Sequence, residues 1–248
     1  MSDELHLTLE GRPVTLGVRR SRRARRMRLV VEAARGGAVL VLPAGAGERD
    51  GRRFVAEHAP WLLRRLAELP QPVPFRDGAV VPYRGVDHVV RHAGSARGPI
   101  ERGVVWRHGG AIHVAGRDEH LARRIRDWFR HEARNVLGPL AETKAAVLGE
   151  RPARVTVRDQ RTRWGSCSAK GALSFNWRLV MAPDAAIDYV VAHEVAHLVE
   201  LNHSPSFWRI VDRLTAHRED GRSWLKAHGD GLHRYGAVHR YGTVLAAT

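Results

Sequence analysis

Alternating and helical patterns divide the first part of the chain into short elements. Residues 5–10 and 13–18 alternate between apolar and polar positions, which predicts a hairpin because successive side chains of a strand point to opposite faces. The apolar runs 29–32 and 38–43, with two glycines between them, predict a second hairpin. Residues 48–69 repeat their apolar positions at helical spacing instead. This part is therefore expected to be β-rich with one helix.

The middle of the chain repeats strand-like patterns before a long helix. A proline-rich segment at 70–74 is typical of a linker or a rigid loop. Four strand-like runs follow it, at 79–83, 86–91, 103–107 and 111–115. Residues 118–148 then show helical periodicity. Gly138 and Pro139 are expected to kink or split that helix, because proline lacks the N–H of a helical hydrogen bond.

The last third combines two strands with further helices. Residues 154–158 and 172–177 have strand character, and 161–168 is expected to be a loop between them. Helices are predicted at 185–200, 205–216 and 220–227. Asp184 is the expected N-cap of the first one. The motif His-Arg-Tyr-Gly occurs twice within 231–248, a segment that we expect to be a flexible tail.

Composition indicates an ordinary globular protein. Of 248 residues, 44% are apolar and 27% are charged, which is close to the average for soluble domains. The chain has no apolar run of about 18 residues and no basic, apolar leader at its start, so neither a membrane partner nor secretion is expected. Cys167 is the single cysteine, which excludes an intrachain disulfide and favours a cytoplasmic location.

Basic residues are in excess, and all but three of them are arginine. The chain has 41 Lys and Arg against 26 Asp and Glu, a net charge of +15, and seven arginines lie within 19–28. A GC-rich bacterial genome explains arginine in place of lysine, but not the excess of basic over acidic residues. An anionic partner is the alternative. Because zinc-finger spacing and RNA-binding aromatic patterns are missing, nucleic-acid contact is expected only without sequence preference.

The sequence His193-Glu194-Val195-Ala196-His197 lies in the predicted helix 185–200. Two histidines four residues apart share one helix face, so both imidazoles can bind one Zn²⁺. Glu194 is displaced by about 100° around the helix, which places it near the metal without making it a ligand. Zinc lowers the pKa of a water molecule that it binds, and Glu194 is then placed to take a proton from that water as a general base.

A third metal ligand is expected soon after this helix. His203 follows His197 by six residues, and a turn at Asn202, which tolerates a left-handed backbone, would present it. Glu200 and Glu219 are rival ligands. Metzincins use the spacing of His203, but they have glycine where this chain has Glu200, and they need a downstream methionine that this chain lacks.

Four segments around the motif carry a family resemblance: 163–168, 176–179, 188–194 and 202–208. They resemble the YgjP-like family of predicted zinc metallopeptidases, whose motif is related to that of SprT-like proteases. The resemblance implies His193, His197 and His203 as zinc ligands and Glu194 as the base. A nucleotide pyrophosphohydrolase activity on UTP has also been attached to this family, so the resemblance indicates the metal site better than the substrate.

Four polar residues near the motif are candidates for substrate binding: Arg161, Arg163, Asn176 and Arg178. The arginines can hold a carboxylate or a phosphate, or stabilise an oxyanion. The alternative for the arginines is a buried ion pair with Asp159 or Asp188, and for Asn176 a structural amide. Cys167 is expected to be a small packed residue rather than a nucleophile.

Together these observations predict an α+β fold in three parts. Residues 1–116 form a mixed, β-rich region with one helix, 117–230 a zincin-like metal-hydrolase domain whose motif helix packs on a small sheet, and 231–248 the tail. The predicted function is that of a zinc metallopeptidase with one zinc ion per chain and a peptide or protein substrate. One alternative is hydrolysis of an anionic nucleotide such as UTP at the same site. The other is a basic nucleic-acid-binding module whose metal is structural.

Overall fold

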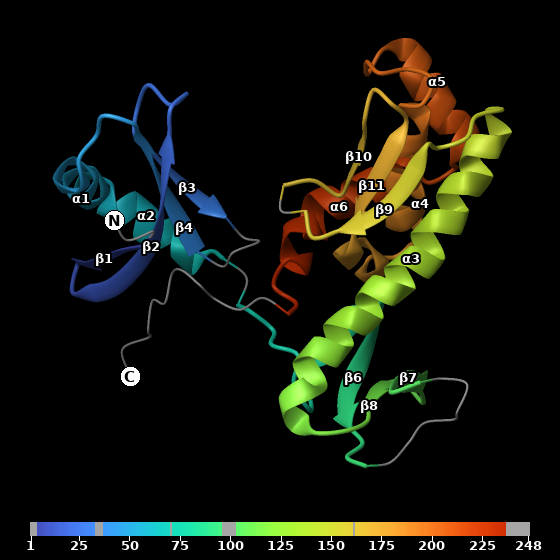
Figure 1. The fold of residues 1–248 in the computed structure, drawn as a ribbon, viewed down its shortest axis with the longest axis horizontal. Coiled ribbons are helices and arrows are strands. Elements are labelled where there is room, and N and C mark those ends of the chain that lie inside the picture. The colour runs from blue at the N-terminus through green and yellow to red at the C-terminus, as the bar shows by residue number, and fades with distance from the viewer. Residues whose placement is uncertain (1–3, 33–36, 70, 96–102, 161, 237–248) are drawn as a thin grey trace. The chain divides into compact units, whose positions relative to one another are not determined.

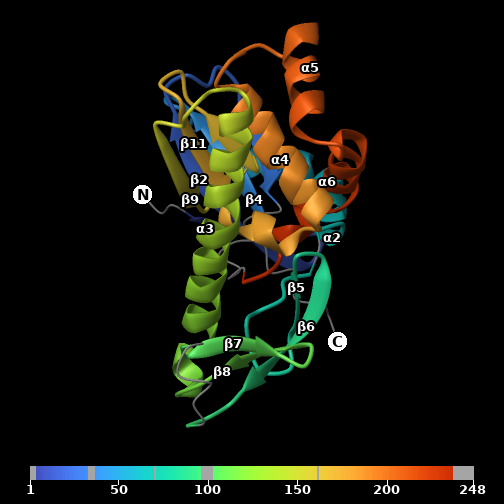
Figure 2. The ribbon, with the colours of Figure 1, turned by 90° about the vertical axis from the view of Figure 1, so that its right-hand side faces the viewer.

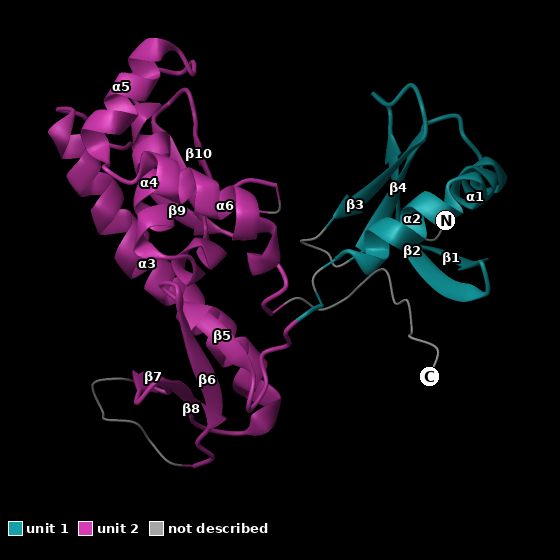
Figure 3. Ribbon diagram, turned by 180° about the vertical axis from the view of Figure 1, so that it is seen from behind, with its two compact units in different colours: residues 1–72, 237–248 teal, residues 73–236 magenta. Residues whose placement is uncertain are grey.

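The computed structural model describes residues 4–32, 37–69, 71–95, 103–160 and 162–236. Helices and small mixed sheets make up the fold, which confirms the predicted α+β class. The chain divides into two compact units, of which unit 1 holds the described residues up to Pro72 and unit 2 holds residues 73–236 (Figure 3). None of the described helices is both long and apolar enough to span a membrane.

Unit 1 is a four-stranded sheet with two helices on one face. Its strands are β1 (Glu4–Leu9), β2 (Arg12–Ser21), β3 (Arg28–Glu32) and β4 (Gly37–Pro43), in the order β1-β2-β4-β3. Both predicted hairpins are confirmed as antiparallel pairs. The central pair, β2 with β4, is parallel. Parallel pairing joins the two hairpins into one sheet, a long-range contact that local patterns do not reveal.

The helical segment of unit 1 is two helices rather than the predicted one. They are α1 (Glu48–Glu57) and α2 (Ala59–Ala67), and they meet at His58. Pro60 lies in the first turn of α2, where its missing N–H removes no helical hydrogen bond but does prevent α1 from continuing through it. Helix α1 packs closely on the sheet, since a Cβ added to Gly51 would lie 2.9 Å from Leu40 Cδ2.

Unit 2 begins with a second four-stranded sheet, at one end of a long helix. The strands are β5 (Val80–Tyr83), β6 (Val86–His92), β7 (Val105–His108) and β8 (Ala111–Val114), in the order β5-β6-β8-β7. Helix α3 (Leu121–Val147) runs from this sheet to the rest of the unit (Figure 1, Figure 2). Val90 and Ile112 of the sheet are buried in the same core as Ile125 and Phe129 of α3.

This shared core corrects the predicted domain boundary at 116. The strands at 79–115 pack with the following helix in unit 2, so the division falls after Pro72 instead. Strand patterns alone do not show which neighbour a sheet packs against. Helix α3 is also unbroken, although Pro139 lies inside it. Pro139 and Asn135, whose carbonyl loses its helical partner, are both exposed, so water can satisfy that carbonyl.

The remaining elements of unit 2 surround the motif helix α4. A three-stranded sheet has the order β10-β11-β9, built from β9 (Arg154–Arg158), β10 (Gly165–Cys167) and β11 (Ala172–Asn176). A 3₁₀ turn at Trp177–Met181 leads into α4 (Asp184–Ala196), which is followed by α5 (Pro205–Leu214) and α6 (Arg218–Leu232). Helix α4 contacts α3, α5, α6 and β10, so it occupies the centre of this unit (Figure 2).

Four local predictions in this region were wrong. The predicted loop 161–168 contains the short strand β10, and α4 ends at Ala196 instead of near 200. Pro183 is the N-cap of α4, while the carboxylate of Asp184 accepts two hydrogen bonds from Arg84, at 2.6 and 2.7 Å. Helix α6 continues to Leu232, so the expected tail from 231 begins inside a helix. The residues after 236 lie outside the described part of the chain.

A buried lysine joins three helices of unit 2. Lys144 Nζ of α3 lies 2.7 Å from the carboxylate of Asp188 in α4 and donates to the carbonyl oxygen of Leu214 at the end of α5, at 2.6 Å. We expect Lys144→Met to lower the free energy of unfolding by roughly 2–3 kcal/mol, because it leaves a carboxylate without its cation. The expected loss is smaller than for a fully buried ion pair, since the Asp188 side chain is 24% exposed.

Urea unfolding followed by tryptophan fluorescence measures this effect, since all the tryptophans except Trp61 lie in unit 2. The matched control is Lys226→Met on α6, where the lysine is exposed. That variant is expected to stay within about 0.5 kcal/mol of the wild type. Equal unfolding free energies for the two variants would show that the Lys144 contact does not hold these helices together.

Candidate metal centre

The structure brings the three histidines of the motif region together. His193 lies in α4, His197 is the C-cap residue of the same helix, and His203 comes from the loop that follows. Each offers a ring nitrogen, and these nitrogens all lie within 4.8 Å of one another. Among the described residues, no other group of three or more His, Cys, Asp or Glu side chains meets in this way.

The chemistry of these nitrogens fits a metal ion. The Nε2 atoms of His193 and His203 lie 3.1 Å apart, and three imidazole nitrogens are the ligand set of several catalytic zinc sites. His197 Nδ1 lies 3.0 Å from the carbonyl oxygen of Glu200. Because a carbonyl only accepts, Nδ1 must carry the proton, and this leaves the lone pair of His197 Nε2 for a metal. The donor set therefore suits Zn²⁺ with an open fourth position.

The carboxylates of the two rival ligands, Glu200 and Glu219, make other hydrogen bonds. Glu200 contacts the cluster through its backbone carbonyl, while its carboxylate accepts a hydrogen bond from the N–H of Asn202 at 3.1 Å. Glu219 accepts from Arg218 Nε at 3.0 Å. The expected left-handed turn at Asn202 is wrong, since the described non-glycine residues with positive φ are Glu10 and Arg84.

Helix α5 holds the third histidine in place. Ser204 directly follows His203 and is the N-cap of α5, where its side chain accepts from the N–H of Phe207 at 3.3 Å. Pro205 at the first position favours a helix start at this point. The Phe207 ring lies 4.6 to 5.0 Å from all three imidazole rings. The buried phenylalanine thus packs against the histidine cluster and fixes the rings relative to one another.

Burial and charge shift the pKa values at this site, most strongly those of His193 and Glu194. The pKa of His193 is lowered to about 4, by burial first and then by the neighbouring His197 and His203. The pKa of the Glu194 carboxyl is raised to about 7 by burial, against the opposing effects of Arg163 and of the N–H of Cys167. Glu194 is only 7% exposed. Its carboxylate accepts that backbone N–H, which orients it between α4 and β10.

Close packing against β10 positions Glu194. A Cβ added to Gly165 would lie 2.4 Å from Glu194 Cγ and 2.7 Å from its Oε1. We expect Gly165→Ala to displace this carboxylate and to lower turnover by about 100-fold, the effect of a misplacement of about 1 Å in a catalytic group. Metal content should not change, because the atoms nearest to the added methyl group belong to Glu194 and not to a histidine.

Turnover, metal content and thermal midpoint measured on the same preparation check this expectation. Gly138→Ala in α3 makes the same chemical change where nothing lies within 4 Å of the added methyl group, and it should keep full activity. Wild-type turnover in a folded Gly165→Ala protein would mean that the position of Glu194 does not depend on this contact.

Two of the four candidate substrate residues are used within the fold. Arg178 is 6% exposed. Its guanidinium donates to Asp159 at 2.5 Å and to the carbonyl oxygen of Tyr235 at 3.2 Å. Asn176 is fully buried. Its amide donates to the carbonyl of Gln160 at 2.6 Å, while its oxygen accepts from the N–H of Arg178 at 2.9 Å. The structural alternative fits both side chains.

Arg163 and Arg161 are the other two candidates for substrate binding. Arg163 is exposed, and its charge lowers the pKa of Glu194, so it lies within electrostatic range of the candidate base. Arg161 lies outside the described residues.

The thiol of Cys167 is half-buried, and its pKa is raised by burial and by Glu194. A neutral thiol is a poor nucleophile, as expected for a packed residue.

Sequence reasoning missed the role of β10 in this site. In an antiparallel pair, alternate residues face the partner strand. The carbonyl oxygen of Trp164 accepts a hydrogen bond from the backbone of β11, and the N–H of Ser168 donates one to it. The backbone groups of Gly165 and Cys167 therefore face the other edge. That edge lies beside Glu194. The glycine in the predicted loop was the available signal, but nothing in the sequence showed its contact with a residue so distant in the chain.

This chain is similar to a known protein family and to a solved structure. Residues 25–228 match the family described as YgjP-like, metallopeptidase domain. A solved structure, the crystal structure of the metallopeptidase zymogen of Pyrococcus abyssi abylysin, shares 24% identity and has a TM-score of 0.33; the match covers 37% of this chain and 94% of that one. No curated protein matches the chain.

Proposed function

Because this chain belongs to the YgjP-like family of metallopeptidase domains, we propose that it is a zinc-dependent peptidase with His193, His197 and His203 as ligands. Family membership indicates a catalytic metal and a peptide substrate. The observation that supports this assignment is the convergence of three ring nitrogens within 4.8 Å, together with the buried side chain of Glu194, which follows His193 in the same helix. A structural zinc site would have no use for that carboxylate, and it is usually closed by a fourth protein ligand.

Glu194 is the proposed general base. One zinc ion, when bound, acts as a Lewis acid on a water molecule and on the carbonyl oxygen of the substrate. Glu194 takes a proton from the attacking water and then delivers it to the nitrogen of the leaving amine. The N–H of Cys167 and the close contact with Gly165 orient the carboxylate for both transfers. The exposed Arg163, whose charge acts on Glu194, would stabilise the negative charge that develops on the carbonyl oxygen.

The outer edge of β10, opposite β11, is the proposed binding surface for an extended peptide. Strand β10 ends the sheet, since its sheet partner is β11. The carbonyl groups of Gly165 and Cys167 face away from β11, toward the edge beside Glu194. A peptide that adds a strand there is held by main-chain hydrogen bonds. Its scissile bond would then lie next to Glu194 and the histidine cluster.

The nucleotide alternative has less support. Convergence of Arg161, Arg163 and Arg178 near the metal would favour a phosphate substrate. Arg178 is buried in an ion pair with Asp159, and among the arginines that the structure describes Arg163 is the one whose charge lowers the pKa of Glu194. The family match indicates a peptidase, so peptide hydrolysis is the proposed activity.

Casein and UTP, offered in parallel to the same zinc-loaded protein, test this proposal. Mass spectrometry should find new peptide termini in casein, and chromatography should find UTP unchanged. Removal of the metal by a chelator should stop casein cleavage, and addition of zinc should restore it. Consumption of UTP with intact casein would assign the site to a nucleotide hydrolase instead.

A further inference from the structure

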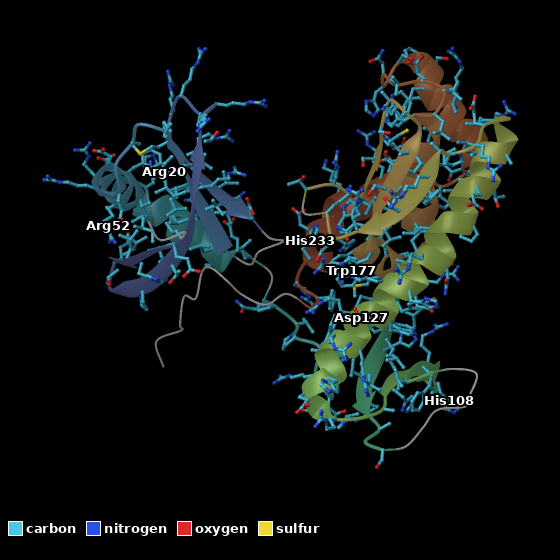
Figure 4. All side chains as sticks on the ribbon, in the orientation of Figure 1. Arg20, Arg52, His108, Asp127, Trp177 and His233 are labelled. Atoms are coloured by element: carbon cyan, nitrogen blue, oxygen red, sulfur yellow. The ribbon has the colours of Figure 1, made fainter. Side chains whose placement is uncertain are left out.

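Unit 1 carries a dense group of arginines that the proposed site does not use. We define the arginine surface as Arg19, Arg22, Arg23, Arg25, Arg26 and Arg28. All six side chains are exposed. They lie at the end of β2, in the turn that follows it and at the start of β3. In Figure 4 several side chains that end in nitrogen project into solvent from this end of the sheet of unit 1.

Strand register places part of this surface on the open face of the sheet. Arg19 of β2 and Arg28 of β3 both pair with Val41 of β4, one on each side. Residues directly opposite in neighbouring strands point to the same face. Leu40, the neighbour of Val41, points to the other face, where α1 covers it. Arg19 and Arg28 therefore flank Val41 on the face that the helices leave open.

Arg20, the residue after Arg19, has a structural role and differs in this from the six arginines of the surface. Arg20 points to the helix side, where its Nη1 donates to the carbonyl oxygens of Ala46 at 2.8 Å and Ala44 at 3.4 Å. This contact ties the end of β2 to the segment before α1. Arg20 is thus explained by the fold and is not included in the arginine surface.

No carboxylate in the described part of the chain pairs with any arginine of this surface. On the helices of the same unit, by contrast, Arg52 pairs with Glu48 at 2.9 Å and Arg65 pairs with Glu68 at 2.7 Å. Segment 19–28 itself contains no acidic residue. Uncompensated like charges repel one another and oppose folding, so the surface is suited to an anion from outside the unit.

The residues of segment 19–28 other than arginine indicate which class of anion the surface can bind. Within 19–28, the residues other than arginine are Ser21, Ala24 and Met27. The segment has no aromatic ring for stacking on bases, no amide for reading base edges and no exposed large apolar side chain for insertion into a lipid surface. Planar guanidinium groups bind phosphate oxygens in pairs. We propose that the arginine surface binds the phosphate backbone of nucleic acid without sequence preference.

Fluorescence anisotropy with a labelled DNA duplex of about 25 base pairs tests this proposal at several salt concentrations. The variant changes the four arginines of the turn, Arg22, Arg23, Arg25 and Arg26, to glutamine. If the four arginines neutralise four phosphates, they contribute about −3.6 to the slope of log binding constant against log salt concentration. This slope corresponds to an affinity loss of about 100-fold between about 50 and 200 mM salt. The variant should lose this salt dependence and bind at least about tenfold more weakly at low salt.

The matched control changes four other exposed arginines, Arg12, Arg49, Arg64 and Arg134, to glutamine. It removes the same charge and should retain most of the wild-type affinity and slope. Two double variants, Arg22→Gln with Arg23→Gln and Arg25→Gln with Arg26→Gln, should each give about half of the slope change. They keep the test valid if the quadruple variant does not fold.

Other polyanions and the catalytic variant complete the test. Poly-glutamate and vesicles of phosphatidylserine should compete poorly with DNA, and a duplex of a second sequence should bind equally well. Glu194→Gln should keep wild-type affinity for DNA, so failure of the proposed peptidase activity would not affect this result. The proposal is overturned if both quadruple variants weaken binding equally, or if vesicles or poly-glutamate bind and DNA does not.

Discussion

Replacing Glu194 with glutamine is expected to lower the rate of peptide hydrolysis by about 10²- to 10⁴-fold, the usual contribution of a general base. The amide has the shape of the carboxylate but cannot accept a proton from water. Because Glu194 is not among the three clustered ligands, metal content should match that of the wild type. The loss should appear in kcat, since the carboxylate is proposed to act on the reacting water rather than to bind the peptide.

Two comparisons separate this effect from a loss of folding. Glu142→Gln makes the same change at an exposed position of α3 and should be fully active. Thermal unfolding should show Glu194→Gln to be folded, because removal of a buried negative charge is not expected to destabilise the unit. A metal-loaded, folded Glu194→Gln protein with wild-type turnover would mean that another group is the base.

The second large effect is expected at the metal. His203→Ala should weaken zinc binding by more than about 100-fold, since the loss of an outer partner of a ligand alone costs about 10- to 100-fold. Activity should be lost in parallel, and excess zinc should restore part of it. Competition with a chromogenic zinc chelator measures the affinity of the variant relative to that of the wild type.

Three controls locate the ligand set. His131→Ala removes an exposed histidine of α3 and should leave zinc affinity unchanged. Glu200→Gln and Glu219→Gln test the rival ligands, and both should also retain zinc, because neither carboxylate belongs to the cluster. Loss of zinc from Glu219→Gln, with retention by His203→Ala, would replace His203 by Glu219 as the third ligand.

The histidine cluster could be predicted from the sequence because its main constraint is local. His193 and His197 share a helix face through their spacing alone, and His203 follows within one short loop. The structure shows all three together. The N-cap Ser204 and Pro205, which start α5 directly after His203, are also local signals.

Contacts between distant segments could not be predicted in the same way. Gly165 approaches Glu194 because β10 packs beside α4, and an isolated glycine in a predicted loop does not reveal its neighbour. The burial of Arg178 with Asp159 depends on tertiary packing in the same way. The boundary expected at 116 failed for a related reason: the strand pattern was correct, but the side on which the sheet packs was not encoded locally.

The most direct test of the account measures metal content and casein cleavage on one preparation of the full chain. We expect stoichiometric zinc, cleavage that stops when a chelator removes the metal, and recovery of cleavage when zinc is returned. Casein cleavage at an undiminished rate by metal-free protein would contradict the central claim that the three histidines hold the catalytic metal.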